Sequence, residues 1–178
     1  MKRTSAAPRN ARRAASAAGE RRGGRLQLAL QYAAARGGLP ARSSVAAWLG
    51  TALAGGRARV TVRFVGAAEG RRLNREFRGR DYATNVLAFA YDGPGNGALT
   101  GDIVLCAPVI AREARSERKP LQAHYAHLTV HGLLHLRGYK HERATDAARM
   151  AAAERRILAT LGFGDPYGIF PAKHGRRR

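Results

Sequence analysis

The period of the hydrophobic residues changes near residue 107, and this change limits the folds that the chain can adopt. Before it, apolar residues alternate with polar or small ones in segments 26–32 and 57–65, as they do in half-buried strands. After it, the apolar residues recur every three or four positions, as they do on the buried face of a helix. Three segments show this helical period: 108–118, 121–136 and 143–162.

The remaining segments complete one folded unit. Helices are expected over 40–54 and within 67–79, and strands over 85–91 and 101–107, joined by the turn-rich loop 92–100. We find no internal repeat. The expected order is strand, helix, strand, helix, strand, strand and then helices. This order predicts an α+β domain in which helices cover a small mixed sheet.

Positive charge gathers at the two ends of the chain. The formal net charge is +20, of which residues 1–42 carry +9 and residues 171–178 carry +4. Such an excess favours a polyanionic partner, nucleic acid before a membrane surface. We predict a disordered basic extension over 1–24, a folded domain over 25–168 and a basic tail over 169–178. A role of these ends in solubility alone stays open.

The chain has one cysteine, Cys106, so a disulfide within the chain is impossible and a reducing compartment is favoured. Its apolar surroundings predict a small core residue rather than a nucleophile. The N-terminus lacks the apolar stretch of a secretory signal, and it fits either an organellar transit peptide or a bacterial basic extension. No apolar run approaches the ~20 residues of a membrane span, so we expect a cytoplasmic protein without a membrane partner.

Four histidines lie between residues 124 and 135, and three of them, His127, His131 and His135, share one helical stripe. A helix rises ~12 Å over eight residues, whereas zinc binds imidazole nitrogen at ~2.0–2.1 Å. One ion can therefore bridge neighbours on this stripe but not all three. We expect a zinc site on this helix of the C-terminal half, with His127 either supporting His131 or packing in the core.

The third ligand of such a site must come from another segment. Gly138 permits a left-handed residue at the helix end, so that the returning chain can bring His141 to the ion held by His131 and His135. Three histidines and a water make an open, catalytic type of zinc site, although nickel or cobalt suits the same donors. Zinc peptidases keep a glutamate base where Gly132 stands, and we expect this glycine to leave open space beside the metal for a bulky charged substrate.

A second stretch, from Leu73 to Phe89, joins the arginines 75, 78 and 80 to Thr84 and Asn85 just before a predicted strand. Guanidinium groups bind phosphate in a bidentate manner and stabilise negative charge in a transition state. The arginines are equally typical of a solvated helix face in a chain this basic.

Two motifs give the chain a resemblance to a known family. "HGLLHLRGYKH" (131–141) and "NREFRGRDYATNVLAF" (74–89) closely resemble the two signature stretches of the YbeY family, and "LTGDIVLC", "KPLQAHYAHLTVHG" and "LGFGDPY" match it as well. The resemblance covers about residues 26–168. It implies an α+β fold with one zinc ion and a single-strand-specific endoribonuclease. Such an enzyme matures the 16S rRNA 3′ end, processes rRNA and serves ribosome quality control, with rRNA and small-subunit proteins as partners.

The resemblance also implies roles for single residues. His131, His135 and His141 would hold the zinc ion, Arg78 would act in catalysis, and the cleft would contain Thr84, Asn85 and Asp102. Lys140 stands where the family usually has aspartate, and it would either weaken metal binding by repulsion or bind an RNA phosphate. Ala88 replaces the usual serine, which we interpret as a packing change. An RNA-binding ribosome-assembly factor with a structural metal, or a metal hydrolase acting on another substrate such as a peptide, remains as an alternative.

Overall fold

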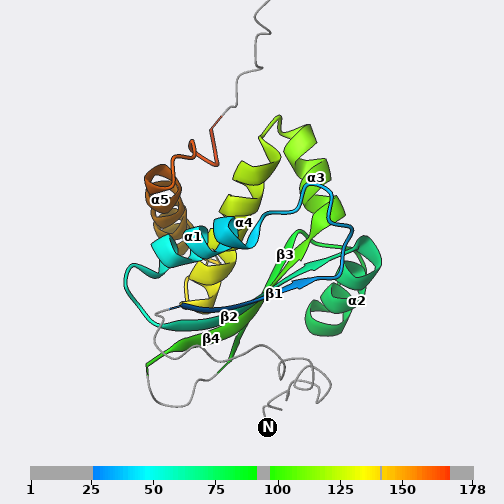
Figure 1. The fold of residues 1–178 in the computed structure, drawn as a ribbon, viewed down its shortest axis with the longest axis horizontal. Helices are drawn as coiled ribbons and strands as arrows, with labels where there is room; N and C mark the ends of the chain where they lie inside the picture. The colour runs from blue at the N-terminus through cyan, green and yellow to red at the C-terminus, as the bar shows by residue number, and fades with distance from the viewer. Residues whose placement is uncertain (1–25, 92–96, 141, 169–178) are drawn as a thin grey trace, which may run out of the picture.

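A computed structural model describes residues 26–91, 97–140 and 142–168. The extension over 1–24, the tail, His141 and most of the predicted loop after residue 91 lie outside the described residues. Nine elements follow one another within the described part (Figure 1). They are β1 (Leu26–Tyr32), α1 (Arg42–Leu53), β2 (Ala58–Val65), α2 (Ala67–Arg78), β3 (Val86–Tyr91), β4 (Leu99–Cys106), α3 (Ala107–Ser116), α4 (Leu121–Leu136) and α5 (Ala144–Thr160).

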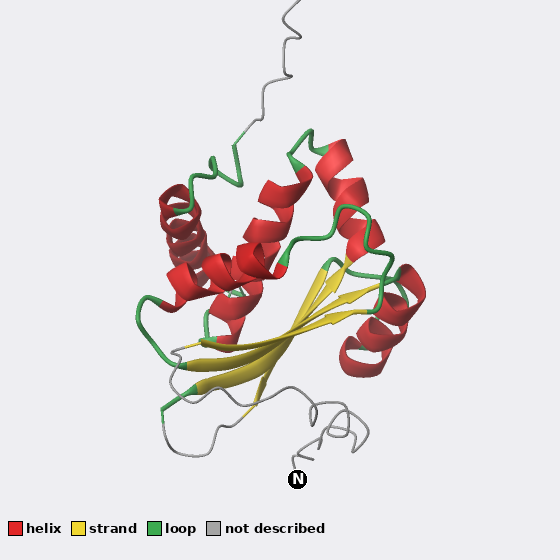
Figure 2. Cartoon of the chain, viewed as in Figure 1, coloured by secondary structure: helices red, strands yellow, loops and turns green. Residues whose placement is uncertain are grey.

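The four strands form one mixed sheet in the order β1-β2-β4-β3. Strands β1, β2 and β4 are parallel, and each parallel connection contains a helix, as such crossovers require. Strand β3 runs antiparallel to β4 at the edge, with Phe89 opposite Asp102 and Tyr91 opposite Thr100. Helices α1 and α4 cover one face of the sheet, α2 packs on the other face, and α5 packs on α4 and α1 (Figure 2). The predicted α+β class and the mixed sheet are confirmed.

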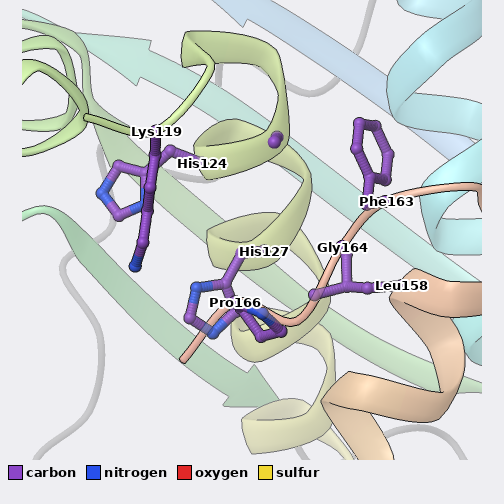
Figure 3. A pocket seen from close by; sticks show the side chains of 8 residues that line it. Lys119, His124, His127, Leu158, Phe163, Gly164 and Pro166 are labelled. Atoms are coloured by element: carbon purple, nitrogen blue, oxygen red, sulfur yellow. The ribbon is translucent and has the colours of Figure 1, made fainter. Parts of the chain in front are cut away.

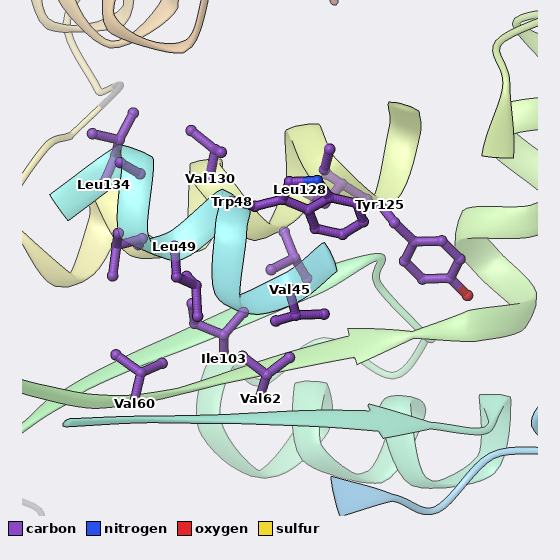
Figure 4. Packing of buried hydrophobic residues seen from close by; sticks show 14 of the residues in the cluster. Val45, Trp48, Leu49, Val60, Val62, Ile103, Tyr125, Leu128, Val130 and Leu134 are labelled. Atoms are coloured by element: carbon purple, nitrogen blue, oxygen red, sulfur yellow. The ribbon is translucent and has the colours of Figure 1, made fainter. Parts of the chain in front are cut away.

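The larger core lies between the sheet and helices α1 and α4 (Figure 4). Alternation along β2 sends Val60, Val62 and Phe64 into this core, where each is at most 1% exposed. They meet the buried stripe of α1, which includes Trp48 and Leu49. Helix α4 packs in the same core through residues such as Leu133 and Leu134, so the helix carrying the histidines is supported by the sheet and by α1.

A smaller cluster fills the opposite face of the sheet. It consists of Val65, Leu87, Val104, Cys106 and Val109, with Leu73 and Phe89 packed against it. Cys106 is buried, and burial raises the pKa of its thiol. The prediction of a core cysteine is therefore confirmed. No helix in the described part of the chain is both long and apolar enough to cross a membrane.

Candidate metal centre

The side chains of His131 and His135 point at each other from successive turns of α4. Their Nε2 atoms lie 3.0 Å apart, and their ring centroids lie 4.6 Å apart. Two nitrogens bound to one tetrahedral zinc ion at ~2.0–2.1 Å would lie about 3.3 Å apart. The pair thus needs to move by only a few tenths of an ångström to share an ion, and the two donors fit a metal.

Glu154 of α5 contacts the ring nitrogen of His131 that faces away from His135. The Glu154 side chain is fully buried within the apolar stripe of α5. The Nδ1–H of His131 donates to Oε1 of Glu154 at 2.7 Å, and the hydroxyl of Tyr167 donates to Oε2. His127 Nε2 lies 3.5 Å from the same Oε2. One carboxylate therefore connects α4, α5 and the segment after α5.

The neighbours of Glu154 keep it ionised. Burial alone raises the pKa of a carboxyl, but His127, His131 and Tyr167 all face this one and lower its pKa to about 2. An ionised carboxylate only accepts hydrogen bonds, so the proton of a neutral His131 sits on Nδ1. The Nε2 atom then presents its lone pair toward His135. This is the tautomer that a metal ligand needs, and a carboxylate behind a ligating histidine commonly sets it.

The described residues offer two ways to hold a metal ion. Donor atoms of His127, His131 and Glu154 lie within 4.8 Å of one another and could hold an ion. An ion there would replace the His131–Glu154 hydrogen bond and would sit beside a carboxylate without solvent exposure. The alternative uses the facing Nε2 atoms of His131 and His135, which are partly exposed. Because a catalytic metal must keep an open position, the second arrangement suits catalysis better.

The end of α4 turns as the sequence predicts. Gly138 has φ +87°, and its N–H bonds the carbonyl of His135 at 2.9 Å. Beyond this turn, a hollow of about 270 Å³ is lined by Arg137, Gly138, Tyr139, Lys140, Asp146 and Arg149. Lys140 is exposed there. Because His141 lies outside the described residues, its role as the third ligand stays a prediction.

Gly132 does not leave space beside the metal, and that expectation was wrong. Gly132 is buried on the side of α4 that faces the sheet, where a Cβ would lie 2.8 Å from Cγ2 of Ile103. The glycine allows α4 to approach β4 closely. Its spacing from His131 places it on a different face of the helix from the two histidines, because adjacent residues are about 100° apart.

Figure 3 shows a small cavity on the other side of His127, between α4 and the segment after α5. It has a volume of about 10 Å³, close to the minimum for one water molecule. The polar groups at its wall belong to Lys119, His124 and His127. His124 Nε2 contacts Glu113 Oε2 at 2.9 Å on the far side. This cavity is too small for a substrate.

Arg78 is the last residue of α2, and Gly79 ends the helix with φ +67°. Its neighbours Arg71 and Arg75 contact Asp81, the former through a bidentate pair at 2.6 and 2.9 Å. Within the described part of the chain, Arg78 has no acidic partner at ion-pair distance and is exposed. Its guanidinium group is therefore available to an anion.

The other predicted cleft residues lie around β3 and β4. Asn85 precedes β3, donates from Nδ2 to Glu113 at 3.1 Å and accepts from the N–H of Val86 through Oδ1. Asp102 accepts from the Tyr91 hydroxyl at 2.7 Å, and burial together with this bond raises the pKa of Tyr91. Thr84 is partly buried in the loop before β3. Asp102 alternates with Ile103, which contacts α4, and so points to the opposite face of the sheet.

Sequence reasoning missed Glu154. A signal was present, because Met150, Ala153, Ile157 and Leu158 form the buried stripe of α5 and Glu154 falls within it. An acidic residue on an apolar stripe must have a partner inside the protein. The identity of that partner could not be read from the spacing, because His131 lies on another helix.

The fold and the site define a class: an α+β protein with a candidate metal centre built on helix histidines and a buried carboxylate. Comparison with known proteins narrows this class. The family model described as Endoribonuclease YbeY matches residues 42–162. The chain belongs to the YbeY family.

Curated relatives support this assignment. A Cupriavidus pinatubonensis protein named Endoribonuclease YbeY is 56% identical over 132 residues, which cover 74% of this chain and 65% of the relative. A Bordetella avium protein of the same name is 53% identical over 151 residues, covering 80% of this chain and 93% of the relative. This chain thus spans slightly less than two thirds of the Cupriavidus relative. The solution structure of the Thermotoga maritima protein TM1509 has a TM-score of 0.52 at 22% identity, covers 85% of this chain and 100% of that one, and shows a shared fold.

Proposed function

We propose that this chain is a zinc-dependent endoribonuclease that cleaves single-stranded RNA. Its tasks would be maturation of the 16S rRNA 3′ end, wider rRNA processing and ribosome quality control in the cytoplasm, in contact with ribosomal small-subunit proteins. Family membership and the relatives named Endoribonuclease YbeY support the reaction class. The observation that carries the proposal is the convergence of two Nε2 atoms at 3.0 Å with a buried carboxylate behind one of them.

His131, His135 and the predicted ligand His141 would hold the zinc ion. Bound there, zinc would supply a Lewis acid and lower the pKa of a coordinated water toward neutrality. Glu154 holds the ring of His131 in place and keeps its proton on Nδ1. Gly138, with φ +87°, turns the chain at the end of α4, and we expect this turn to bring His141 to the ion.

Substrate contacts would come from the arginine and lysine groups near the site. Arg78 would hold and neutralise a phosphate, because it has no acidic partner among the described residues. Lys140 is exposed at the hollow beyond α4, where it would bind a further phosphate of the RNA rather than weaken metal binding by repulsion. Thr84, Asn85 and Asp102 would shape the cleft, with Asn85 held by Glu113 and Asp102 holding Tyr91.

Glu154 is unsuited to act as the general base. Its carboxylate is fully buried and faces three partners, and its pKa of about 2 is far from the pH at which proton transfer must occur. We therefore assign Glu154 a positioning role.

The test combines metal analysis with RNA cleavage by the full chain. We expect about one zinc ion per chain in the wild type and in His127→Ala, and loss of the ion in His135→Ala. Loss in His127→Ala and retention in His135→Ala would place the ion in the His127–His131–Glu154 group instead. Cleavage of single-stranded rRNA fragments should disappear in His135→Ala, and it should fall roughly 10²–10³-fold in Arg78→Gln.

Two outcomes would contradict the nuclease proposal. Cleavage that is unchanged in both His135→Ala and Arg78→Gln would identify a contaminating nuclease as its source. A metal-loaded wild type that binds RNA without cutting it would support the alternative of an assembly factor with a structural metal.

A further inference from the structure

Three of the exposed aromatic side chains come from one short stretch of the sequence. Among the described residues, the large apolar side chains with substantial exposure are Phe77 (42%), Tyr82 (52%), Tyr91 (40%) and Tyr167 (51%). Three of these four lie in the stretch from the end of α2 to the end of β3. Scattered exposed apolar residues need no explanation, but a group on one surface indicates a binding site.

Two of the exposed rings, Phe77 and Tyr91, lie at the same face of the edge strand β3 as a third ring, that of Phe89. The rings of Phe77 and Phe89 lie 4.8 Å apart at 62°, an edge-to-face contact. Tyr91 follows Phe89 by two residues on β3, so both side chains point to the same face of the sheet. We call Phe77, Phe89 and Tyr91 the aromatic surface.

The aromatic surface is held in position. The Tyr91 hydroxyl donates to Asp102 on the neighbouring strand at 2.7 Å, which restrains its ring. Phe89 packs against the smaller core cluster. Asn74 is buried and donates to the carbonyl of Tyr82 at 2.8 Å, and this bond ties the loop after α2 to the helix. An edge-to-face pair leaves at least one face of each ring uncovered by the other ring, and Phe77 and Tyr91 are the members of the surface with substantial exposure.

Charge beside the aromatic surface indicates the kind of partner. Arg78 follows Phe77 directly and has no acidic partner within the described part of the chain. Of the formal net charge of +20, residues 1–42 and 171–178 carry +13, so Arg78 is the cation on which the choice of partner depends here. A neighbouring cation and aromatic rings suit a ligand that alternates flat bases with phosphates, because every base can stack on an aromatic ring. A purely apolar partner would gain nothing from the arginine.

We propose that the aromatic surface is a subsite that binds unpaired nucleobases of single-stranded RNA by stacking, while Arg78 holds the adjoining phosphate. The subsite rests on the proposed function in that it takes RNA as the substrate, and it adds a reason for single-strand preference. Bases that are paired in a duplex are stacked inside it and cannot reach the rings.

The test measures binding of the full chain to two fluorescent RNAs of about 12 nucleotides, within the range of single-strand site sizes. One RNA carries all its bases, and the other has abasic ribose at its central positions. Wild type should bind the abasic RNA roughly 5- to 150-fold more weakly, as stacking energies imply. Phe77→Leu should weaken binding of the complete RNA by about tenfold and leave binding of the abasic RNA nearly unchanged. Phe77→Tyr, the matched control that keeps the ring, should resemble the wild type.

A second pair of variants, at Tyr91, distinguishes the loss of a stacking ring from a folding defect in the Phe77 variants. Tyr91→Leu removes a ring, whereas Tyr91→Phe keeps the ring and loses only the bond to Asp102. The same loss should appear in Tyr91→Leu and not in Tyr91→Phe. Arg78→Gln should instead flatten the salt dependence by about one phosphate contact, and the two leucine variants should leave that slope unchanged.

The proposal is overturned if the leucine variants bind both RNAs as the wild type does, or weaken both RNAs equally. Unchanged binding of both RNAs by the leucine variants would indicate that the aromatic surface binds a protein partner instead. Binding is measured apart from cleavage, with the RNA checked for integrity. A protein that shows the stacking pattern but cuts no RNA would therefore refute the nuclease function and keep the subsite.

Discussion

Replacing Glu154 by glutamine tests the central feature of the candidate metal centre. Glutamine has nearly the same shape, but it offers one acceptor oxygen and one donating amide group. The buried carboxylate accepts bonds from both His131 and Tyr167. In Glu154→Gln, one carboxylate oxygen becomes a donating amide group, and the negative charge facing His131 is lost. The proton of His131 is then held on Nδ1 less strongly.

The expected loss of stability follows from the pKa of Glu154. The surroundings lower this pKa from 4.5 to about 2, and each pKa unit corresponds to about 1.4 kcal/mol. Ionised Glu154 thus contributes about 3 kcal/mol to the free energy of unfolding of the metal-free protein. Because the folded pKa is the lower one, this contribution is present above pH 4.5 and disappears as the pH falls toward 2. Near pH 7 the variant should melt roughly 6–12 °C below the wild type.

Urea unfolding of the metal-free proteins from neutral to acidic pH measures this contribution directly. The difference between wild type and Glu154→Gln should shrink as the pH falls through 4.5 toward 2. The matched control is Glu113→Gln. Glu113 of α3 contacts His124 at 2.9 Å, and His124 lies on the same helix as His131, but Glu113 does not contact His131. Zinc affinity should fall about 10- to 100-fold in Glu154→Gln, and it should stay unchanged in Glu113→Gln.

Two results would refute this reasoning. A stability difference that keeps its full size at acidic pH would show that the lost stability does not come from the ionised carboxylate. Equal zinc affinities of Glu154→Gln and Glu113→Gln would show that Glu154 does not orient a metal ligand.

Two further substitutions test the glycines of the histidine motif. Gly132→Ala should destabilise the protein by about 1–3 kcal/mol in urea unfolding, because its Cβ would lie 2.8 Å from Ile103 Cγ2. The loss should shrink by about 0.5 kcal/mol or more in an Ile103→Ala background, and additive effects would contradict the contact. Gly138→Ala should cost about 1–2 kcal/mol, since φ is +87° there. It should also weaken zinc binding in a metal titration, and an unchanged zinc affinity would argue against the turn toward His141.

The elements with strong periodicity could be predicted from the sequence, whereas their pairing could not. Alternation of Val60, Val62 and Phe64 identified β2, and the stripe around Trp48 and Leu49 identified α1. The order β1-β2-β4-β3 depends on which strand edges meet after collapse, and no local pattern encodes that choice. The strand over 85–91 was predicted, but its antiparallel pairing at the edge of the sheet became visible only in the structure.

In the candidate site, too, the features within one helix could be predicted from the sequence, whereas the contacts between elements could not. A spacing of four residues predicts that His131 and His135 face each other, because both side chains belong to one helix. Glu154 is 23 residues from His131 along the chain, and only the packing of α5 on α4 brings them together. Gly132 was misinterpreted for a related reason, since the residue that fills the space beside it, Ile103, belongs to the sheet.

The cost of Glu154 itself argues for a functional role. An ionised carboxylate without solvent exposure loses its hydration, and replacing buried ionic groups by well-packed apolar side chains is often neutral or stabilising. Apolar side chains in place of Glu154, His131 and Tyr167 together would extend the stripe of Ile157 and Leu158, so stability alone does not account for this buried polar group. What an apolar side chain cannot do is accept the proton of His131 Nδ1 and leave Nε2 facing His135. Sequence rules tend to fail at functional sites for this reason, and here the exception to the apolar pattern of α5 points to the metal centre on α4.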